Sequence, residues 1–379
     1  MYVLDLCQRL LKCPSITPED AGAIAVVSDA LEEIGFKCHR LPFSDSQSPP
    51  VNNLYGRIGT GNPHFCFAGH TDVVPVGDAA HWSFHPFEGH VEDEMLYGRG
   101  AVDMKGAIAC FIAASKEFLQ DKGAAFKGSI SLMITGDEEG PAINGTVKIL
   151  EWLKARNEII DACLIGEPTS KTQVGDIVKI GRRGSLNAEI IIHGMQGHVA
   201  YPELADNPIP RLLSFLTEIT TPPLDQGSEA FQPSHLEITS IDVGNLASNV
   251  IPQAASANFN IRFNDHHTGQ KLIKWLDEIA LKTAGAHTLT AHNSGEPFCT
   301  HPGAFKDTIV QAIQKVTGHT PELSTSGGTS DGRFIHYHTP VIECGLKNAT
   351  AHQIDEHVAI QDLKILKMIY KEILERFFA

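Results

Sequence analysis

The chain has 379 residues, more than one compact core usually holds, so two domains are expected. A hydrophobic fraction of 42% and a charged fraction of 20% are typical of a soluble globular protein. The net charge of −15 disfavours a nucleic-acid surface, which needs clustered Lys and Arg, and no apolar run is long enough to span a membrane.

Two features favour a cytoplasmic location. The first residues, Met1 to Leu6, show no basic stretch leading into an apolar run, so no secretory signal is expected. The eight cysteines are spread singly, without a Cys-x-x-Cys pair, and several lie in apolar runs where a free thiol behaves as a small hydrophobe. We therefore expect free thiols in a reducing compartment.

The first part of the chain alternates helical and strand patterns, as an α/β sandwich does. Each predicted strand stops at a glycine that is followed by polar residues. In open α/β sheets, ligands gather at the carboxyl ends of the strands, so these polar residues are candidate functional groups. The expected elements are helices over 19–35 and 107–119 and strands over 64–68, 130–135 and 161–165.

The middle of the chain has another character, with elements in the order β-α-β-β-α-β of a ferredoxin-like unit. Because the last residues return to the α/β style, this part is interpreted as an insertion. We expect a discontinuous α/β catalytic domain over 1–180 and 294–379 and an inserted α+β domain over 181–293. The expected elements of the insertion are strands over 186–192, 236–243, 255–263 and 287–291 and helices over 209–220 and 268–283; a strand over 340–344 and a helix over 362–378 follow it.

Two candidate metal ligands, His70 and Asp103, stand beside elements in the first part of the chain. His70 follows the strand 64–68, and Asp72 is suited to hold the second ring nitrogen of a metal-bound histidine. The alternative is an ordinary surface histidine in a loop. Asp103 precedes the helix 107–119, where it is either an N-cap or a carboxylate that bridges two metal ions.

Four further candidates follow later strands. Glu138 and Glu139 are adjacent after an apolar strand, so their mutual repulsion favours a bound cation; a solvated acidic turn is the alternative. If this segment is extended, the two side chains point in opposite directions, one toward the metal and one toward a water molecule. We assign Glu139 as ligand and Glu138 as general base and acid. Glu167 and His352 also follow strands, although both residue types are common in loops.

The candidate ligands are imidazoles and carboxylates without cysteine, a set that favours zinc and tolerates cobalt or manganese. No Gly-x-Ser-x-Gly motif supports a serine nucleophile. The glycine-rich run at 327–332 lacks the spacing and the lysine of a phosphate-binding loop, and it is interpreted as a turn that contacts substrate. These patterns favour metal-assisted cleavage of an amide bond.

The motifs resemble those of a known family, the dinuclear zinc deacylases and exopeptidases that include aminoacylase, acetylornithine deacetylase and glutamate-releasing carboxypeptidases. The resemblance covers essentially the whole chain. The general motifs are His70-Thr71-Asp72, the Gly-Arg-Gly-Ala-Val-Asp-Met-Lys-Gly run at 98–106, Glu138-Glu139 and Gly166-Glu167-Pro168. Narrower motifs, at 181–185, 194–202 and 327–334, resemble a bacterial branch that removes a succinyl group from a diamino diacid.

The resemblance implies a fold, a cofactor and a partner. The fold is the zinc-exopeptidase-like α/β catalytic domain with an inserted ferredoxin-like dimerisation domain. Two zinc ions are implied, one held by His70 and Glu167 and the other by Glu139 and His352, with Asp103 between them. The chain forms a homodimer in which His198 and Asn249 reach the active site of the partner subunit.

The resemblance also implies the substrate, N-succinyl-LL-2,6-diaminopimelate, which is split into succinate and LL-2,6-diaminopimelate on the way to lysine and peptidoglycan. Several carboxylates on this small molecule suit bidentate arginine. His198 of the partner subunit is expected to stabilise the oxyanion. The expected substrate contacts are Lys179, Arg182, Ser185, Asn249, Arg262, Gly328, Thr329 and Asn348.

Two alternatives stay open at this point. The first is another activity of the same family, an acetylornithine deacetylase or a broader N-acyl amino acid deacylase, because acyl pockets are weakly distinguished by sequence. The second is a catalytically silent protein that binds metal or ligand. The complete ligand set together with Glu138 argues against the second, since a binding protein needs no base beside its metals. No nucleic acid and no membrane is expected as a partner.

Overall fold

The computed structural model describes residues 2–46, 49–300 and 303–379, which form two compact units. Unit 1 comprises Met1–Ile180, Thr300–Ser324 and Ser330–Ala379, and unit 2 comprises Gly181–Cys299 and Thr325–Thr329. Residues 294–299 thus group with the inserted unit, because β16 (Phe298–Cys299) pairs with β9 (Gly181–Arg182) and closes the insertion at its two ends.

An eight-stranded sheet, in the order β1-β2-β6-β3-β7-β18-β8-β17, runs through unit 1. Its centre is parallel: β3 (His64–His70) lies between β6 (Ser129–Thr135) and β7 (Ala162–Ile165), and β18 (Val341–Glu343) runs beside β7. All four strands are buried, as expected of parallel strands covered on both faces. The outer strands are β1 (Lys37–Phe43), β2 (Val51–Gly59), β8 (Ile177–Lys179) and β17 (Glu322–Ser324).

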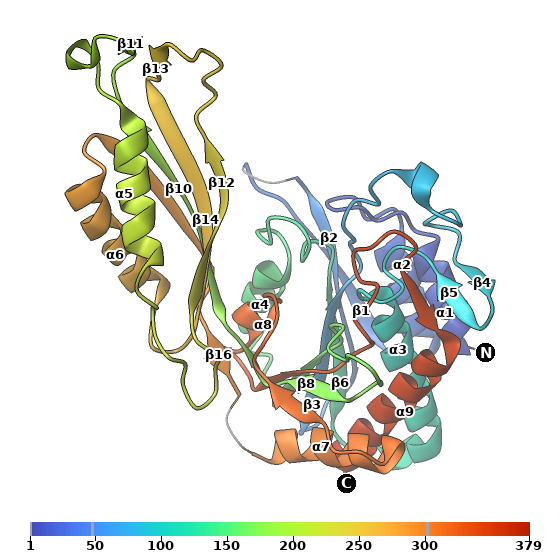
Figure 1. Ribbon diagram of the computed structural model, residues 1–379. Coiled ribbons are helices and arrows are strands. Elements are labelled where there is room, and N and C mark those ends of the chain that lie inside the picture. The colour runs from blue at the N-terminus through green and yellow to red at the C-terminus, as the bar shows by residue number, and fades with distance from the viewer. Residues whose placement is uncertain (1, 47–48, 301–302) are drawn as a thin grey trace. The chain divides into compact units, whose positions relative to one another are not determined.

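Helices cover both faces of this sheet (Figure 1). On one face, Phe67 of β3 stacks on Phe111 of α3 with 4.3 Å between ring centroids, and it meets Tyr370 of α9 edge-on at 5.7 Å. On the other face, Trp152 of α4 lies 5.6 Å from the ring of Tyr55. The helices of unit 1 are α1 (Tyr2–Leu11), α2 (Ala23–Glu33), α3 (Lys105–Lys122), α4 (Thr146–Lys154), α7 (Ala304–Thr317), α8 (Gly332–Ile335) and α9 (Ile360–Phe377).

A small sheet beside the large one brings distant segments together. β5 (Met95–Tyr97) pairs with β4 (His90–Glu92) on one side and with β19 (His357–Ala359) on the other, in the register His357 opposite Tyr97. The residues after β5 and before β19 are therefore neighbours, although about 260 positions separate them in the chain.

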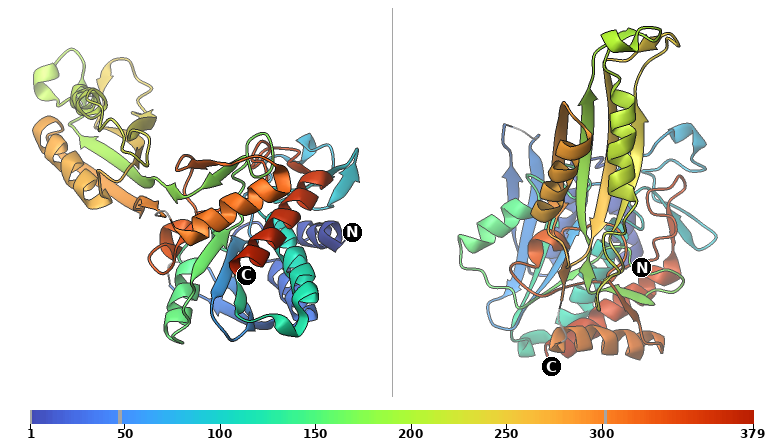
Figure 2. Two further views of the ribbon diagram at one scale, coloured as in Figure 1. Left: turned by 90° about the horizontal axis from the view of Figure 1, so that it is seen from below. Right: turned by 60° about the vertical axis from the view of Figure 1, so that its left-hand side comes forward.

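Unit 2 is an antiparallel sheet in the order β12-β14-β10-β15 with two helices packed against it (Figure 2). In chain order the elements run β-α-β-β-α-β, so the predicted ferredoxin-like arrangement is confirmed. A short ladder of β11 (Gly197–His198) and β13 (Val250–Ile251) extends from it. The main elements are β10 (Gly184–His193), α5 (Pro208–Thr220), β12 (His235–Asp242), β14 (Ala254–Phe263), α6 (Gly269–Thr283) and β15 (His287–Gly295).

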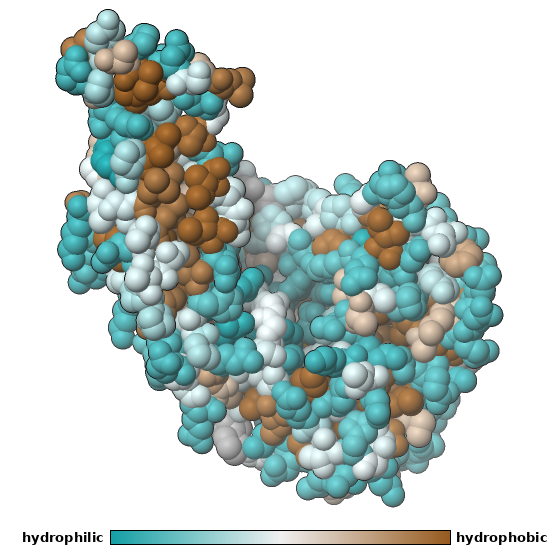
Figure 3. Space-filling model, viewed as in Figure 1, coloured by the Kyte–Doolittle hydropathy of each residue, from teal (hydrophilic) through white to brown (hydrophobic). Residues whose placement is uncertain are grey.

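Unit 2 leaves large apolar side chains exposed. Figure 3 shows apolar atoms gathered on the visible face of this unit. The exposed large hydrophobic residues of the unit include Met195, Val199, Tyr201, Leu204, Ile241 and Leu246. Contiguous exposed apolar surface is uncommon on monomers and marks interaction sites.

Every predicted helix and strand is present, with shifted ends, and the predicted α/β fold with its inserted unit is confirmed. The largest shifts are of four residues: β15 ends at Gly295 instead of residue 291, and α2 begins at Ala23 instead of residue 19. Ala21 and Gly22 have positive φ angles of 48° and 88°, which a right-handed helix does not accept. Within the described residues, no helix is long and apolar enough to cross a membrane, and all eight cysteines are free thiols.

Candidate active site

Polar side chains meet at the carboxyl edge of the central parallel strands. His70 is the last residue of β3, and Glu167 lies two residues after the end of the neighbouring β7. A glycine precedes each of these two residues, and close packing leaves little room for a side chain at either glycine. A Cβ on Gly69 would lie 2.5 Å from Met104 Cε, and one on Gly166 would lie 2.7 Å from the same atom. Met104 therefore packs under both strand ends, and Nε2 of His70 lies 3.7 Å from Oε1 of Glu167.

Asp103 stands between two imidazoles. Its Oδ1 lies 3.1 Å from Nε2 of His70, and its Oδ2 lies 3.2 Å from Nε2 of His352. Nε2 of His352 also lies 2.8 Å from Oε1 of Glu139. The N-cap interpretation of Asp103 is wrong, because the N-cap of α3 is Met104 and no side chain caps this helix. One oxygen of Asp103 faces each half of the cluster.

Asp72 holds neighbouring groups through two different parts. Its backbone carbonyl accepts a hydrogen bond from Nδ1 of His70 at 2.9 Å, which leaves the Nε2 lone pair of a neutral His70 facing the cluster. Its carboxylate lies farther from that ring, at 3.6 Å, and accepts from the backbone amides of Glu138 at 3.3 Å and Glu139 at 3.0 Å. Asp72 thus fixes the imidazole with its main chain and the two glutamates with its side chain.

The prediction that the two glutamates lie in an extended segment is wrong. β6 ends at Thr135, and the backbone bends from Gly136 to Gly140. Their different directions are therefore set by the bend and by Asp72, not by strand alternation. Glu139 meets His352 and Asp103, whereas Glu138 groups with His70 and Glu167.

The ionisation of the cluster reflects its crowding. Burial first, and the Glu167 carboxylate second, raise the pKa of Glu138 well above its ordinary value. The carboxylates of Asp103 and Glu139 raise the pKa of His352 to about 10. Burial raises the pKa of Asp103, but the two imidazoles outweigh it and hold this pKa below its ordinary value. In the protein alone, protons on the imidazoles offset part of the negative charge.

The donor set fits divalent cations. One group of ligand atoms, from His70, Asp103 and Glu139, lies within 4.8 Å of one another, and so does a second, from His70, Glu138 and Glu167. Imidazole nitrogen and carboxylate oxygen without thiolate suit zinc, manganese or cobalt. A cation placed among these atoms replaces the imidazolium protons and screens the carboxylates from one another.

A group of basic residues gathers at one end of the sheet in unit 2. Ser185 of β10 stands opposite Arg262 of β14, and Nη1 of Arg182 donates to the carbonyl of Gly328 at 3.0 Å. Burial first, and the nearby Arg183 second, lower the pKa of Arg262 below its ordinary value. Half-buried arginines that repel one another form a site for an anion with several charges.

The other predicted site residues lie in three places. In unit 1, Nζ of the buried Lys179 donates to Oγ of Ser324 at 3.2 Å, and Asn348 is exposed. Thr329 is half-buried in the segment 325–329 that groups with unit 2. His198 lies in β11 and Asn249 directly precedes β13; the two are near each other, because His198 pairs with Val250 and the amide of Val199 donates to the carbonyl of Asn249 at 3.0 Å.

The sequence analysis missed three buried charged residues near the cluster. Glu356 is fully buried and accepts from three backbone amides at and beside Asp103, and Arg99 pairs with it at 2.8 Å. Asp331 is buried at the start of α8, where its Oδ2 accepts from Thr146 at 2.6 Å. The signals in the sequence were the positions of Arg99 in the 98–106 motif and of Asp331 in the 327–334 motif; the partners of these side chains are remote in sequence.

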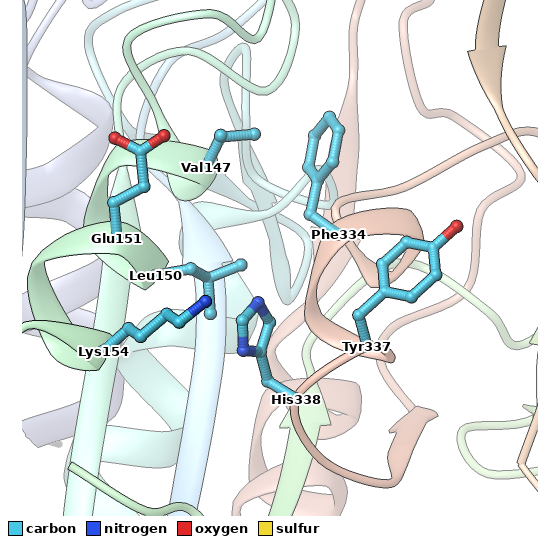
Figure 4. A pocket seen from close by; sticks show the side chains of 7 residues that line it. All are labelled: Val147, Leu150, Glu151, Lys154, Phe334, Tyr337 and His338. Carbon is cyan, nitrogen blue, oxygen red and sulfur yellow. The ribbon is translucent and has the colours of Figure 1, made fainter. Parts of the chain in front are cut away.

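A surface pocket of about 280 Å³ lies elsewhere on unit 1 (Figure 4). It opens between α4 and the segment around α8, and none of its lining residues is a candidate ligand. The lining residues are Val147, Leu150, Glu151, Lys154, Phe334, Tyr337 and His338.

An α/β sheet that gathers imidazoles and carboxylates at its carboxyl edge, with a further glutamate beside them, defines a metal-dependent hydrolase. The sequence model of Peptidase family M20/M25/M40 matches residues 66–376. The chain belongs to this family.

Curated relatives extend over nearly the whole chain. Succinyl-diaminopimelate desuccinylase from Rhodospirillum centenum is 56% identical over 99% of this chain and 97% of its own length. The enzyme of the same name from Parvibaculum lavamentivorans is 53% identical over 99% of this chain and 95% of its own length. Among solved structures, an M20 family metallo-carboxypeptidase from Sulfolobus solfataricus matches with a TM-score of 0.81 and 19% identity, over 100% of this chain and 99% of that one.

The Asp331 carboxyl group predicts a pH dependence of stability. Burial raises its pKa from 3.8 to about 6, and among the described residues no donor reaches its Oδ1. Because the folded chain holds this proton more tightly than the unfolded chain, the contribution of Asp331 to stability falls as the pH rises from about 4 to about 6. Asp331→Asn avoids this loss.

We expect Asp331→Asn to be about 1–3 kcal/mol more stable than the unmodified chain at pH 7.5 and to keep only about one third of that advantage at pH 4.5. Urea unfolding at both pH values measures the difference, with the exposed Asp93→Asn as control. An equal gain at both pH values would contradict an effect of ionisation.

Proposed function

We propose that this chain hydrolyses the amide bond of N-succinyl-LL-2,6-diaminopimelate, releasing succinate and LL-2,6-diaminopimelate, with two bound metal ions, preferably zinc. The observation that carries the proposal is the carboxylate of Asp103, with one oxygen 3.1 Å from His70 and the other 3.2 Å from His352. The substrate follows from the name of the curated relatives, at 53% and 56% identity.

In this proposal, His70 and Glu167 would hold one ion, Glu139 and His352 would hold the other, and Asp103 would be shared by both. The arrangement is supported by the separate directions of the two Asp103 oxygens and by the position of Glu139 next to His352. When bound, the ions lower the pKa of a water molecule to about 7 and polarise the amide carbonyl.

Glu138 is the carboxylate that remains for proton transfer. Its backbone amide is held by Asp72, and its side chain groups with His70 and Glu167. Glu138 takes the proton from water as the oxygen attacks the amide carbon, and it delivers that proton to the departing amine. Burial raises the pKa of this carboxyl group, and a raised pKa suits the delivery of the proton to the amine.

The basic group in unit 2 provides the contacts for the carboxylates of the substrate. Arg182 and Arg262 are partly buried, so ion pairs with a carboxylate there are shielded from water and stronger than at the surface. Ser185 adds a neutral hydrogen-bonding group on the strand that pairs with β14. Lys179, Gly328, Thr329 and Asn348 are proposed as further contacts.

We also propose a homodimer in which unit 2 forms the interface. β12 is an edge strand of its sheet, and exposed hydrophobic side chains of unit 2 include Val199, Tyr201 and Leu246. An open edge and an apolar surface both favour pairing with a second copy. The free thiols of all eight cysteines are compatible with a cytoplasmic location.

The dimer gives His198 and Asn249 a role. β10 pairs with β14 over ten residues, with Ser185 and Arg262 near one end and the chain leading to His198 at the other. Ten strand residues span about 30 Å, so His198 is remote from the basic group of its own chain. The chain connections to unit 1 at residues 180–181 and 299–300 leave from the end near Ser185, and the short segment 325–329 meets the same end, where Gly328 accepts from Arg182. His198 therefore serves the partner's site.

Glu138→Gln is expected to lower kcat by roughly 10²–10⁴ while two metal ions stay bound, because the amide keeps the size of the side chain and removes the base. Turnover of the succinylated substrate and metal analysis of the same sample measure the two effects. The exposed Glu94→Gln is the control. Near-normal turnover would remove Glu138 from this role.

Substrate preference separates this proposal from its alternatives. We expect kcat/KM for N-succinyl-LL-2,6-diaminopimelate to exceed that for N-acetylornithine by about 10³ or more, because the acetyl group lacks the carboxylate that an arginine would pair with. Parallel assays on the two substrates measure the ratio. Preference for the acetylated substrate would favour a deacetylase, and cleavage of neither would favour a binding protein.

Subunit mixing tests the shared site. An equal mixture of Glu138→Gln and His198→Ala chains is expected to recover about one quarter of the full activity, since half of the dimers are mixed and one of their two sites is complete. Each variant alone supplies the baseline. Absence of recovery, with exchange of subunits demonstrated by mass spectrometry, would show that His198 does not act across the interface.

A further inference from the structure

A buried ion pair behind the candidate metal centre is not used by the proposed reaction. Glu356 has no exposed surface, and its carboxylate accepts from the backbone amides of Gly100 at 3.0 Å, Val102 at 2.9 Å and Asp103 at 3.2 Å. Nη1 of Arg99 donates to the same carboxylate at 2.8 Å. Four donors on one carboxylate hold the segment 100–103 at a fixed distance from Glu356.

Arg99 makes the complementary contacts to the loop that carries His352. Its Nη1 donates to the carbonyl of Gln353 at 3.1 Å, and its Nη2 donates to the carbonyl of His352 at 3.4 Å. Nη2 also donates to the carbonyl of Pro75 at 3.3 Å. The planar guanidinium therefore ties three loops together, which a single ammonium group cannot do.

Pairing of β5 with β19 explains why these residues meet. Arg99 comes two residues after β5 and Glu356 comes directly before β19, and the amide of Gly98 donates to the carbonyl of Glu356 at 2.9 Å. The pairing of β5 with β19 thus places Arg99 and Glu356, which carry opposite charges, together in a buried position next to Asp103.

The two halves of the candidate centre are held in different ways. His70 is 1% exposed and ends a central strand, and Glu167 follows the neighbouring strand, so the sheet itself positions both. The side chain of His352 is 49% exposed and its φ angle is 61°. Packing around its side chain contributes little, so the position of His352 depends on how its loop is anchored.

We propose that Arg99 and Glu356 are positioning residues that hold Asp103 and His352 and thereby set the affinity of one half of the metal centre, the half formed with Glu139. This inference rests on the proposed function, because it assumes that the cluster binds two ions. The half formed by His70 and Glu167 shares Asp103 but not His352, so it depends on the pair less.

Two substitutions separate the contribution of Glu356 to the position of Asp103 from the contribution of Arg99 to the position of His352. Glu356→Gln keeps the shape but turns an NH2 group toward backbone amides that need an acceptor, so the segment carrying Asp103 shifts. Arg99→Lys keeps the charge but loses the simultaneous contacts to the carbonyls of His352 and Gln353. Glu158→Gln is the matched control: Glu158 pairs with Arg57, also in unit 1, away from the ligand loops.

The experiment is a titration of Co²⁺ into the full-length chain after its metals are removed with a chelator, followed by visible absorption and calorimetry. The unmodified chain and Glu158→Gln are expected to take up two ions in two steps. In Glu356→Gln and Arg99→Lys, the second step is expected to be weakened by roughly 10–100-fold and the first step much less, because only the shared Asp103 connects the first half to the pair. Circular dichroism checks that each variant is folded.

Each outcome has a definite meaning. If the unmodified chain does not bind two ions, the proposed function fails, and the inference fails with it. If it binds two and both variants bind two with unchanged affinities, or lose both steps equally, only the inference is overturned. If Glu356→Gln does not fold, Arg99→Lys decides; if neither folds, the pair has a structural role and the inference is overturned.

Discussion

The repulsion among carboxylates at the carboxyl edge of the central sheet is the constraint on which the rest of the structure depends. Glu138, Glu139, Glu167 and Asp103 converge where water is largely excluded, and burial raises the pKa of Glu138 well above its ordinary value. Two imidazoles offset only part of this charge. A site that gathers more negative charge than its own side chains can balance is suited to divalent cations.

Much of the surrounding structure holds these anions in place through their own backbone amides, which donate to other buried carboxylates. Asp72 uses its carboxylate to fix the backbone of both adjacent glutamates, and Glu356 fixes the backbone up to Asp103. The Arg99 guanidinium supplies a full positive charge that contacts Glu356 directly. Backbone amides therefore do most of the positioning, and they do so without adding side chains to the space where a substrate must enter.

Unit 2 has the opposite electrostatic character at one end. Arg182, Arg183 and Arg262 lie close enough that Arg183 helps lower the pKa of Arg262, while the catalytic candidates of unit 1 are mainly acidic. The proposed division of labour follows: unit 1 carries out the chemistry, and unit 2 recognises an anionic substrate. The relatives named as succinyl-diaminopimelate desuccinylases match over nearly the whole chain, so both units have counterparts in them.

The sequence by itself determined the strands, because buried parallel strands are continuous apolar runs whose ends are local features, and it thereby placed His70, Glu167 and His352 after strand ends. The resemblance to a known family added their division between two metal ions, with Asp103 between them. Only the tertiary structure decided which atoms meet: that the main-chain carbonyl of Asp72 faces His70, that a bend sets the directions of Glu138 and Glu139, and that Glu356 meets Arg99 across 257 positions. The reason is physical, since hydrogen bonds between remote loops depend on how strands such as β5 and β19 pair, and no local pattern encodes that pairing.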